Sequence, residues 1–344
     1  MKGEEVRRIQ LTGRSTYIVS LPKKWVAEMG LKTGSQVVIL REGESLVLVP
    51  RGLAESRMGS QEALLKISDG DTPDKLARAI IAIYLNGYNS IRIVTSSDQI
   101  TPLQRNAISE LVRKKIVGTE IIFDSPREMV LKVLVSYPEL SVESALRRMY
   151  LVASSMFEGA VKALINSDKE LAKNIIELDD EVDRFGFYIV RQLKAAVQNS
   201  KILKDIGLSS ARDCLGYRII VKFVERIADH AARIAENVLS IDERLEESVL
   251  EGVSKISSFA KLMFEKSIES LFRGDYILAE EVVSKARSIA SLEVELMKTL
   301  LEKTGKTISP NIRIILENIR RVGEYSSDIA EVVLNLNVDK MLAQ

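Results

Sequence analysis

The spacing of hydrophobic residues changes twice along the chain and divides it into three zones. In residues 1–52, apolar residues alternate with polar ones in VRRIQLT and TYIVSLP, which predicts two short strands. Farther on, QVVIL and SLVLV flank REGE and predict a β-hairpin. Between these pairs, KKWVAEMG predicts a short helix that ends at Gly30. The first zone is therefore predicted to be a small β-rich domain.

The second zone, residues 62–136, follows a polar linker over residues 53–61 and alternates strand and helix patterns. It predicts strands at ALLKI, SIRIVTS, TEIIFD and EMVLKVLVSY, and helices at TPDKLARAIIAIYLNGY and TPLQRNAISELVRKKI. Thr101 is placed to cap the second helix, with Pro102 in its first turn. The zone contains no glycine-rich phosphate loop, Ser–His pair or metal-ligand cluster. We interpret this small α/β domain as a spacer or dimerisation module.

The third zone, residues 139–344, is predicted to be helical because apolar residues recur at i, i+3, i+4 and i+7. Its breaks predict six long helices. The segment MFEGAVKALINSDKELA aligns without gaps with MFEKSIESLFRGDYILA, and RIADHAARIAENVL matches RVGEYSSDIAEVVL. Two three-helix units, residues 139–240 and 242–338, therefore follow one plan and predict tandem three-helix bundles. The predicted fold class is a multidomain α+β protein with an all-α C-terminal region.

Two pairs of acidic residues, each with i,i+4 spacing, occur in the first helical repeat. Glu225 and Asp229 lie on the polar side of the predicted helix over residues 215–238, opposite its apolar stripe, and Asp179 and Asp183 repeat the spacing in LDDEVD. Like charges at this spacing destabilise a helix by roughly 0.2–0.5 kcal/mol unless a cation lies between them. Antiparallel packing would gather four carboxylates, which suits a hard cation or iron. The alternatives are a salt-bridged, solvated surface or a docking face.

The composition restricts the class of function. The chain has 344 residues, 46% of them hydrophobic, which is enough for two or three domains with buried cores. Its only cysteine, Cys214, excludes a disulfide framework, and the sequence shows neither a signal peptide nor an apolar run of about 18 residues. We therefore expect a cytoplasmic protein without membrane insertion. The only histidine, His230, lies near the apolar stripe and is expected to be partly buried with a structural role, so we expect no enzymatic activity.

The acidic segments resemble the motifs of a known family. VERIADHAARIAENV resembles the ERIGDxxxxIAE hallmark of the PhoU family, LDDEVD resembles its DxxID motif, and six helices in two repeats match its architecture. The resemblance implies a regulator of phosphate uptake and homeostasis, and some members bind iron or other metals on these motifs. It assigns iron or another divalent metal to Asp179, Asp183, Glu225 and Asp229. Because Arg320 replaces the first acid of the motif in the second repeat, we expect one metal site, not two.

The N-terminal segment GRSTYIVSLPKKWVAEMGLKTGSQV resembles the SpoVT/AbrB-like family of swapped-hairpin DNA-binding modules. The resemblance implies that residues 1–52 form a β-barrel completed by strands from two chains, since so short a segment buries little core alone. Such a homodimer would read a roughly two-fold symmetric site on double-stranded DNA. The combination of this module with a PhoU-like region resembles archaeal phosphate uptake regulators over the whole chain.

The distribution of charge supports a DNA-binding N-terminus independently of the resemblance. The formal net charge of the chain is +1, but residues 1–51 hold nine Lys and Arg against five Glu, a net charge of +4, and the remainder therefore carries −3. Five basic residues are the candidates for DNA contacts: Arg7, Arg8, Arg14, Lys23 and Lys24. The alternative is that these residues only keep the domain soluble.

The sequence thus leads to two functional hypotheses. The first is a DNA-binding transcriptional regulator of phosphate uptake and homeostasis that senses its signal through the PhoU-like helical region. The second is a cytoplasmic adaptor that binds and inhibits a phosphate transporter component or a signalling protein without binding DNA. The first requires two states of the chain with different affinities for DNA.

Overall fold

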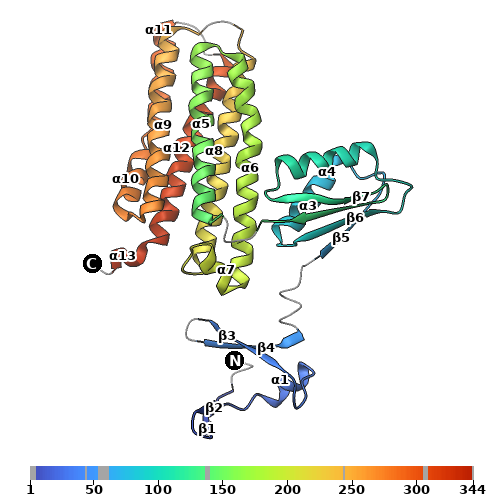
Figure 1. Cartoon of the computed structure of the whole chain (residues 1–344). Helices are drawn as coiled ribbons and strands as arrows, with labels where there is room; N and C mark the ends of the chain where they lie inside the picture. The colour runs from blue at the N-terminus through green and yellow to red at the C-terminus, as the bar shows by residue number, and fades with distance from the viewer. Residues whose placement is uncertain are drawn as a thin grey trace. The chain divides into compact units, whose positions relative to one another are not determined.

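The computed structural model describes residues 5–42, 45–52, 62–135, 140–242, 245–304 and 309–342. It divides the chain into two compact units, unit 1 (Met1–Gln61) and unit 2 (Glu62–Gln344) (Figure 1). The predicted linker, residues 53–61, lies outside the described residues. The α/β and helical zones, which the sequence predicts as domains over residues 62–136 and 139–344, belong to the same compact unit.

The described residues of unit 1 contain four short strands and the helix α1 at the predicted positions, and residues 51–52 are also helical. β1 (Gln10–Thr12) pairs antiparallel with β2 (Thr16–Ile18), and β3 (Val37–Glu42) pairs antiparallel with β4 (Ser45–Pro50). Between the two hairpins, α1 (Lys23–Glu28) ends just before Gly30, whose φ of +65° favours glycine. The predicted barrel is not seen in one chain: within the described residues, the hairpins form two separate two-stranded sheets.

The described part of unit 1 has almost no hydrophobic core of its own. Among its described residues, only Val49 is buried, at 7% exposed. Many of its large apolar side chains are exposed instead, namely Val6, Ile9, Leu11, Tyr17, Ile18, Val19, Met29, Ile39, Leu40 and Leu46. A single chain therefore leaves most of the apolar surface of this unit in water, where it cannot contribute to stability.

Unit 2 begins with a four-stranded sheet and two helices, which we name the α/β module (residues 62–135). Its elements are β5 (Glu62–Ile67), α3 (Pro73–Leu85), β6 (Ser90–Thr95), α4 (Pro102–Lys114), β7 (Thr119–Asp124) and β8 (Glu128–Val133). The strand order is β5-β6-β8-β7, with β5 and β6 parallel and the other neighbours antiparallel. Thr101 caps α4 in a capping box with Gln104, and Pro102 occupies its first turn, as predicted.

The core of the α/β module lies on one face of its sheet. Along β6, Ile91 and Ile93 are buried, whereas Arg92 points to the opposite face and is exposed. Tyr84 of α3 belongs to the same core, and Phe187 from the helical region packs against it. The module is therefore joined to the helical region through apolar contacts as well as through the chain.

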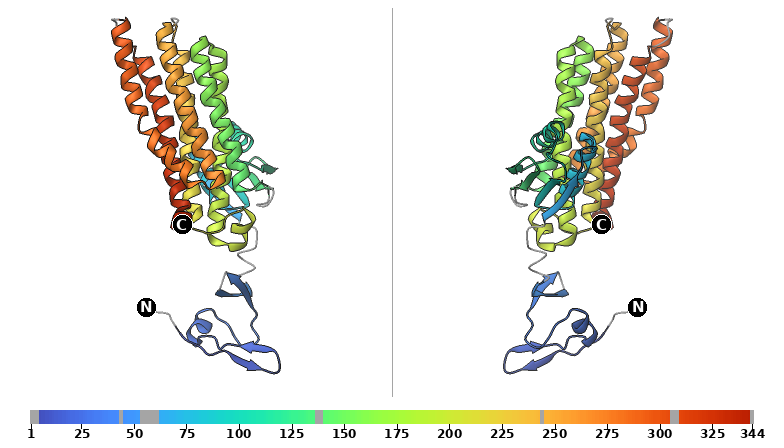
Figure 2. Two further views of the ribbon diagram at one scale, coloured as in Figure 1. Left: turned by 90° about the vertical axis from the view of Figure 1, so that its left-hand side faces the viewer. Right: turned by 90° about the vertical axis from the view of Figure 1, so that its right-hand side faces the viewer.

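The rest of unit 2 is helical, with long helices running side by side (Figures 1 and 2). The helices are α5 (Val142–Asn166), α6 (Lys169–Gln198), α7 (Ser200–Asp205), α8 (Asp213–Leu239), α9 (Glu247–Arg273), α10 (Tyr276–Ala286), α11 (Ile289–Thr304), α12 (Pro310–Leu336) and α13 (Val338–Leu342). The fifth of the six predicted long helices is interrupted, which separates α10 from α11. At this point the Ser288 hydroxyl donates a hydrogen bond to the Lys285 carbonyl oxygen at 2.7 Å. Such side-chain hydrogen bonds compete with the backbone hydrogen bonds of a regular helix.

A continuous hydrophobic core runs through both helical repeats. The predicted apolar stripe of α8 is buried in full, with Ile220, Val224, Ile227, Ala231, Ile234 and Val238 in the core. α8 packs against α5 and α6 of its own repeat and against α12 of the second repeat. The two repeats therefore share one core rather than forming independent bundles. Within the described part of the chain, no helix combines the length and apolarity needed to cross a membrane.

Candidate functional site

The four acidic residues predicted as metal ligands lie on two neighbouring helices. Asp179 and Asp183 belong to α6, and Glu225 and Asp229 belong to α8, which packs against α6. The charges of Asp183 and Asp229 act on Asp179, and the charge of Glu225 acts on Asp183. All four side chains are partly buried rather than solvated. We name these four residues and the adjacent Asp180 the acidic face.

Burial and mutual repulsion raise the pKa of two of these carboxyl groups. The pKa of Asp179 is raised to about 7, chiefly by burial and then by the charges of Asp183 and Asp229. Burial also raises the pKa of Asp183, although the ammonium group of Lys115 acts in the opposite direction. The acidic face therefore carries less than its full negative charge near neutral pH.

Lysine side chains supply cations at the acidic face. Lys115, which directly follows α4, lies with Nζ 3.0 Å from Asp180 Oδ1 and 3.2 Å from Asp183 Oδ2. Burial alone would lower the pKa of Lys115, but the hydrogen bond to Asp180 and the charge of Asp183 outweigh burial and raise this pKa. On α8, Lys222 Nζ lies 2.5 Å from Glu225 Oε1. Three of the five carboxylates thus contact an ammonium group.

The acidic face in this arrangement does not fit a bound metal ion. A divalent cation needs several oxygen ligands that converge within about 2.0–2.6 Å of one point. Across the described residues, no group of three or more His, Cys, Asp or Glu side chains is arranged to hold a metal ion. Two predicted ligands, Asp183 and Glu225, are engaged by lysines instead. The predicted site at Asp179, Asp183, Glu225 and Asp229, and its iron or other divalent metal, stay predictions.

The corresponding place in the second repeat contains an arginine, as the sequence alignment predicts. Arg320 aligns with Glu225, and its Nε lies 2.8 Å from Glu293 Oε2 on α11. Arg320 also forms an ion pair with Glu324, which aligns with Asp229. In the second repeat, a side chain of the third helix therefore pairs with Glu324, the one acid retained at the four aligned positions.

His230 is buried at the contact between the third helices of the two repeats. Its Nδ1 lies 2.5 Å from Asn318 Oδ1 on α12, and its ring centre lies 5.5 Å from that of Tyr325, the aligned residue of the second repeat. Burial lowers the pKa of His230 despite the hydrogen bond to Asn318. These contacts support the predicted structural role.

Replacing Asp179 with asparagine is expected to stabilise the metal-free protein at pH 8 and to have little effect near pH 4. The pKa of Asp179 is about 7 in the folded chain, against an ordinary value of 3.8. As the pH rises through this window, the unfolded chain releases the proton before the folded chain does, so the stability of the wild type falls. An asparagine side chain at this position cannot ionise and avoids this loss. Because the side chain is partly exposed, the gain is on the order of 1 kcal/mol.

Urea unfolding with a chelator present, near pH 4 and at pH 8, measures this difference. D69N provides the control for the substitution itself, because Asp69 is an exposed aspartate of the α/β module, outside the acidic face. Wild-type and D179N stabilities that differ by the same amount at both pH values would contradict the prediction.

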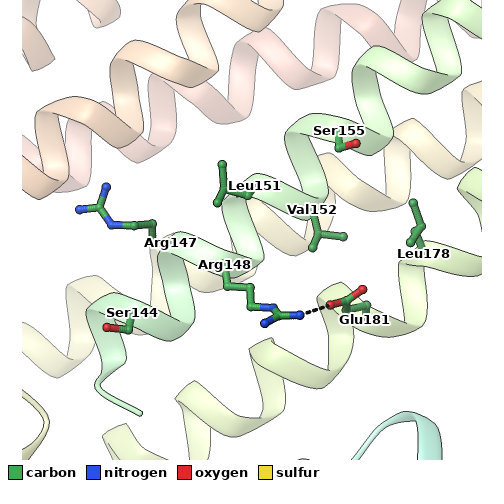
Figure 3. A pocket seen from close by; sticks show the side chains of 8 residues that line it. All are labelled: Ser144, Arg147, Arg148, Leu151, Val152, Ser155, Leu178 and Glu181. Carbon is green, nitrogen blue, oxygen red and sulfur yellow. Dashed lines mark hydrogen bonds and ion pairs between the residues drawn. The ribbon is translucent and has the colours of Figure 1, made fainter.

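A groove between α5 and α6 carries two arginines (Figure 3). Its lining residues are Ser144, Arg147, Arg148, Leu151, Val152, Ser155, Leu178 and Glu181. Arg148 lies 3.4 Å from Glu181, and Arg147 lies 3.2 Å from Glu143 while its guanidinium stacks 4.1 Å from the ring centre of Phe272. Because both arginines are already paired with carboxylates, we assign no anion site to this groove.

The five basic residues predicted to contact DNA are all exposed in unit 1. Arg7 and Arg8 precede β1, Arg14 lies in the turn between β1 and β2, and Lys23 and Lys24 begin α1. Arg7 and Lys24 each lie beside a glutamate of the same segment. Their exposure is compatible with phosphate contacts, and their role in binding DNA stays a prediction.

Sequence reasoning missed two residues that connect the α/β module to α6. Lys115 ends the run RKK at the C-terminus of α4, where basic residues are ordinarily explained by the helix dipole. Arg191 of α6 is 3% exposed and donates hydrogen bonds to the carbonyl oxygens of Tyr84, Gly87 and Tyr88. The only sequence signal for Arg191 is its position among apolar residues of α6, and no local signal identifies the partners of Lys115.

Comparison with known proteins assigns the helical region to a family. A family model described as the PhoU domain matches residues 146–238 and 253–333, together half of the chain. The chain belongs to the PhoU family, which confirms the resemblance seen in its acidic motifs. Residues 10–55 match a model described as antidote-toxin recognition MazE, bacterial antitoxin, and this match supports the predicted AbrB-like character of unit 1.

Similar proteins include two described as phosphate-specific transport system accessory protein PhoU homologs. The protein from Pseudomonas aeruginosa is 25% identical over 202 residues, which cover 57% of this chain and 81% of the relative. The protein from Aquifex aeolicus is 27% identical over 159 residues, which cover 45% of this chain and 70% of the relative. The crystal structure of PhoU from Pseudomonas aeruginosa matches with a TM-score of 0.50 at 23% identity, covering 58% of this chain and 96% of that chain, and shows the shared helical fold. Both relatives are described as accessory proteins, not as enzymes.

Proposed function

We propose that this chain is a cytoplasmic, DNA-binding transcriptional regulator of phosphate uptake and homeostasis, without enzymatic activity. Unit 1 binds DNA, and the helical region of unit 2 receives the signal. The observation that carries the proposal is the presence of a basic AbrB-like unit and a PhoU domain in one chain. The PhoU relatives are named as accessory proteins of phosphate-specific transport, which suggests phosphate supply as the regulated process. The archaeal origin stays a prediction.

The exposed apolar surface of unit 1 supports a homodimer. With Val49 as the only buried residue among those described, the unit lacks the core that a stable domain needs. Two copies could cover each other's apolar strands and complete the predicted barrel. A two-fold dimer would in turn recognise a two-fold symmetric DNA site. Sedimentation of the full chain is expected to give a dimer, and a monomer at micromolar concentration would contradict this part of the proposal.

The charge distribution supports DNA binding by unit 1 rather than by unit 2. Residues 1–51 carry a net charge of +4, whereas the rest of the chain carries −3. Phosphate contacts contribute most of the sequence-independent affinity and make it fall steeply with salt, while contacts to base edges provide sequence preference. Arg7, Arg8, Arg14, Lys23 and Lys24 are the residues proposed for these contacts.

Fluorescence anisotropy with labelled promoter fragments of phosphate-transport genes tests the proposed function. The full-length chain is expected to bind these fragments more tightly than unrelated DNA of the same length, and a chain that lacks residues 1–61 should bind neither above background. Equal binding by the full-length and shortened chains would refute the assignment of DNA binding to unit 1. Equal binding to promoter and unrelated fragments would refute a role as a sequence-specific regulator.

A second candidate function is an adaptor that docks on a phosphate transporter component. The descriptions of the relatives as transport system accessory proteins favour it. In this case unit 1 would only hold two chains together, and a helical surface of unit 2 would bind the transporter. Retention of the transporter ATPase by immobilised chain, together with DNA binding at background level, would favour the adaptor over the transcriptional regulator.

A further inference from the structure

The acidic face already contains a cation that belongs to the chain. Lys115 places its ammonium group within 3.0–3.2 Å of both Asp180 and Asp183, which lie nearly one turn apart on α6. Lys115 is about one third exposed and Asp183 less than one fifth, so these ion pairs are only partly solvated. A second cation close to the same carboxylates would be repelled by the ammonium and would compete for the same oxygen atoms.

The second repeat keeps only part of this arrangement, because the gapless alignment of the repeats places Ala286 and Ala290 opposite Asp179 and Asp183. There, Arg320 of the third helix neutralises Glu293 and Glu324. In the first repeat, the residue that aligns with Arg320 is Glu225, so the repeat lacks this arginine. Instead, Lys222 of α8 pairs with Glu225, and the α/β module adds a second positive charge through Lys115 at Asp180 and Asp183. In both repeats, acidic side chains of this region thus pair with basic side chains of the protein.

We propose that the acidic face is a docking site for the α/β module, that Lys115 is its resident cation, and that a divalent metal ion and the docked Lys115 exclude each other there. The α/β module is then neither a spacer nor a dimerisation module but an internal occupant of the PhoU acidic motif. This role accounts for the absence of a metal-binding arrangement among the described residues. This proposal is independent of whether unit 1 binds DNA.

The rest of the contact between the module and α6 holds Lys115 in place. Arg191 lies just over two helical turns beyond Asp183 on α6. Its guanidinium binds backbone carbonyls at the C-terminal end of α3, including that of Tyr88 at 2.9 Å. Between these two polar contacts, Phe187 packs against the core of the module. The three residues lie at Asp183, Phe187 and Arg191, a spacing of four that puts them on one side of α6. This side of α6 therefore contacts the module.

Titration with Mn²⁺ alone, followed by isothermal calorimetry and by electron paramagnetic resonance of free Mn²⁺, tests the proposal on the full chain. Lys115→Met is expected to bind Mn²⁺ at least tenfold more tightly than the wild type, because two carboxylates lose their counter-ion. Lys114→Met removes an equal charge one residue earlier, from α4, and is expected to behave like the wild type. Lys115→Arg keeps the charge and should also resemble the wild type.

The double variant Lys115→Met with Asp183→Asn locates the bound ion, since it should lose the gain in affinity. Lys115→Gln is measured alongside, with circular dichroism on each variant, so that at least one folded neutral variant decides the question. The proposal would be overturned if the neutral variants bound Mn²⁺ with the same affinity as the wild type, or if neither they nor the wild type bound it. A gain that survives Asp183→Asn would overturn it as well.

Discussion

Replacing both Arg7 and Arg8 with glutamate is expected to lower the affinity of the full-length chain for phosphate-transport promoter DNA by at least about 100-fold at physiological salt. Both residues are exposed and immediately precede β1 in the unit that carries the positive charge. In a dimer the change removes four positive charges and introduces four negative ones beside the DNA phosphates. The variant should also show a weaker salt dependence, because fewer counterions are released when it binds.

Anisotropy titrations between about 50 and 200 mM salt give both the affinity and its salt dependence. Lys201 and Lys204 provide the matched control, since both are exposed on α7 of unit 2 and K201E/K204E changes the net charge by the same amount. This control is expected to bind DNA within about threefold of the wild type, because its charges lie outside unit 1. Similar losses in both double variants would mean that net charge, not a local DNA-binding surface, determines the affinity.

Replacing Arg191 with methionine is expected to destabilise unit 2 by roughly 3 kcal/mol. Besides Tyr84, Gly87 and Tyr88, the Arg191 guanidinium binds Asn89 Oδ1 at 2.6 Å and lies 4.8 Å from the ring centre of Tyr84. The Tyr84 carbonyl belongs to the last turn of α3 and also accepts from the Gly87 N–H, whereas the Gly87 and Tyr88 carbonyls follow the helix end, where the partial negative charge favours a cation. Methionine fills much of the space but donates no hydrogen bond, so the oxygens of Gly87, Tyr88 and Asn89 would lose this donor.

Urea unfolding measures this loss, and amide hydrogen exchange along α3 reports whether it begins at the module. Lys194→Met is the matched control, because the Lys194 ammonium donates to Asn86 Oδ1 at 3.1 Å in the same region but is exposed. K194M is expected to change stability by no more than about 0.5 kcal/mol. If R191M unfolds at the same urea concentration as the wild type, the guanidinium does not fasten the module to α6.

Much of the local structure follows from the sequence because its causes are local. The strands of unit 1, the elements of the α/β module and most helices occur where periodicity, Thr101 and the turn residues predict them. The interruption between α10 and α11 is an exception, since it depends on a hydrogen bond from Ser288 that leaves little trace in the hydrophobic pattern. The acidic pairs and Arg320 could also be identified from the sequence, because each pair and its alignment depend only on residue spacing within a single helix.

By itself, the sequence determined the zones, the repeats, the apolar stripe of α8 and the positions of the four predicted metal ligands. Only the tertiary structure decided which cation meets the acidic face, because Lys115 and Asp183 are 68 residues apart and belong to different zones. It also decided that Arg191 binds the end of α3 and that one core serves both repeats. Such contacts depend on how whole elements pack against one another, and the spacing of residues within any single element does not encode that packing.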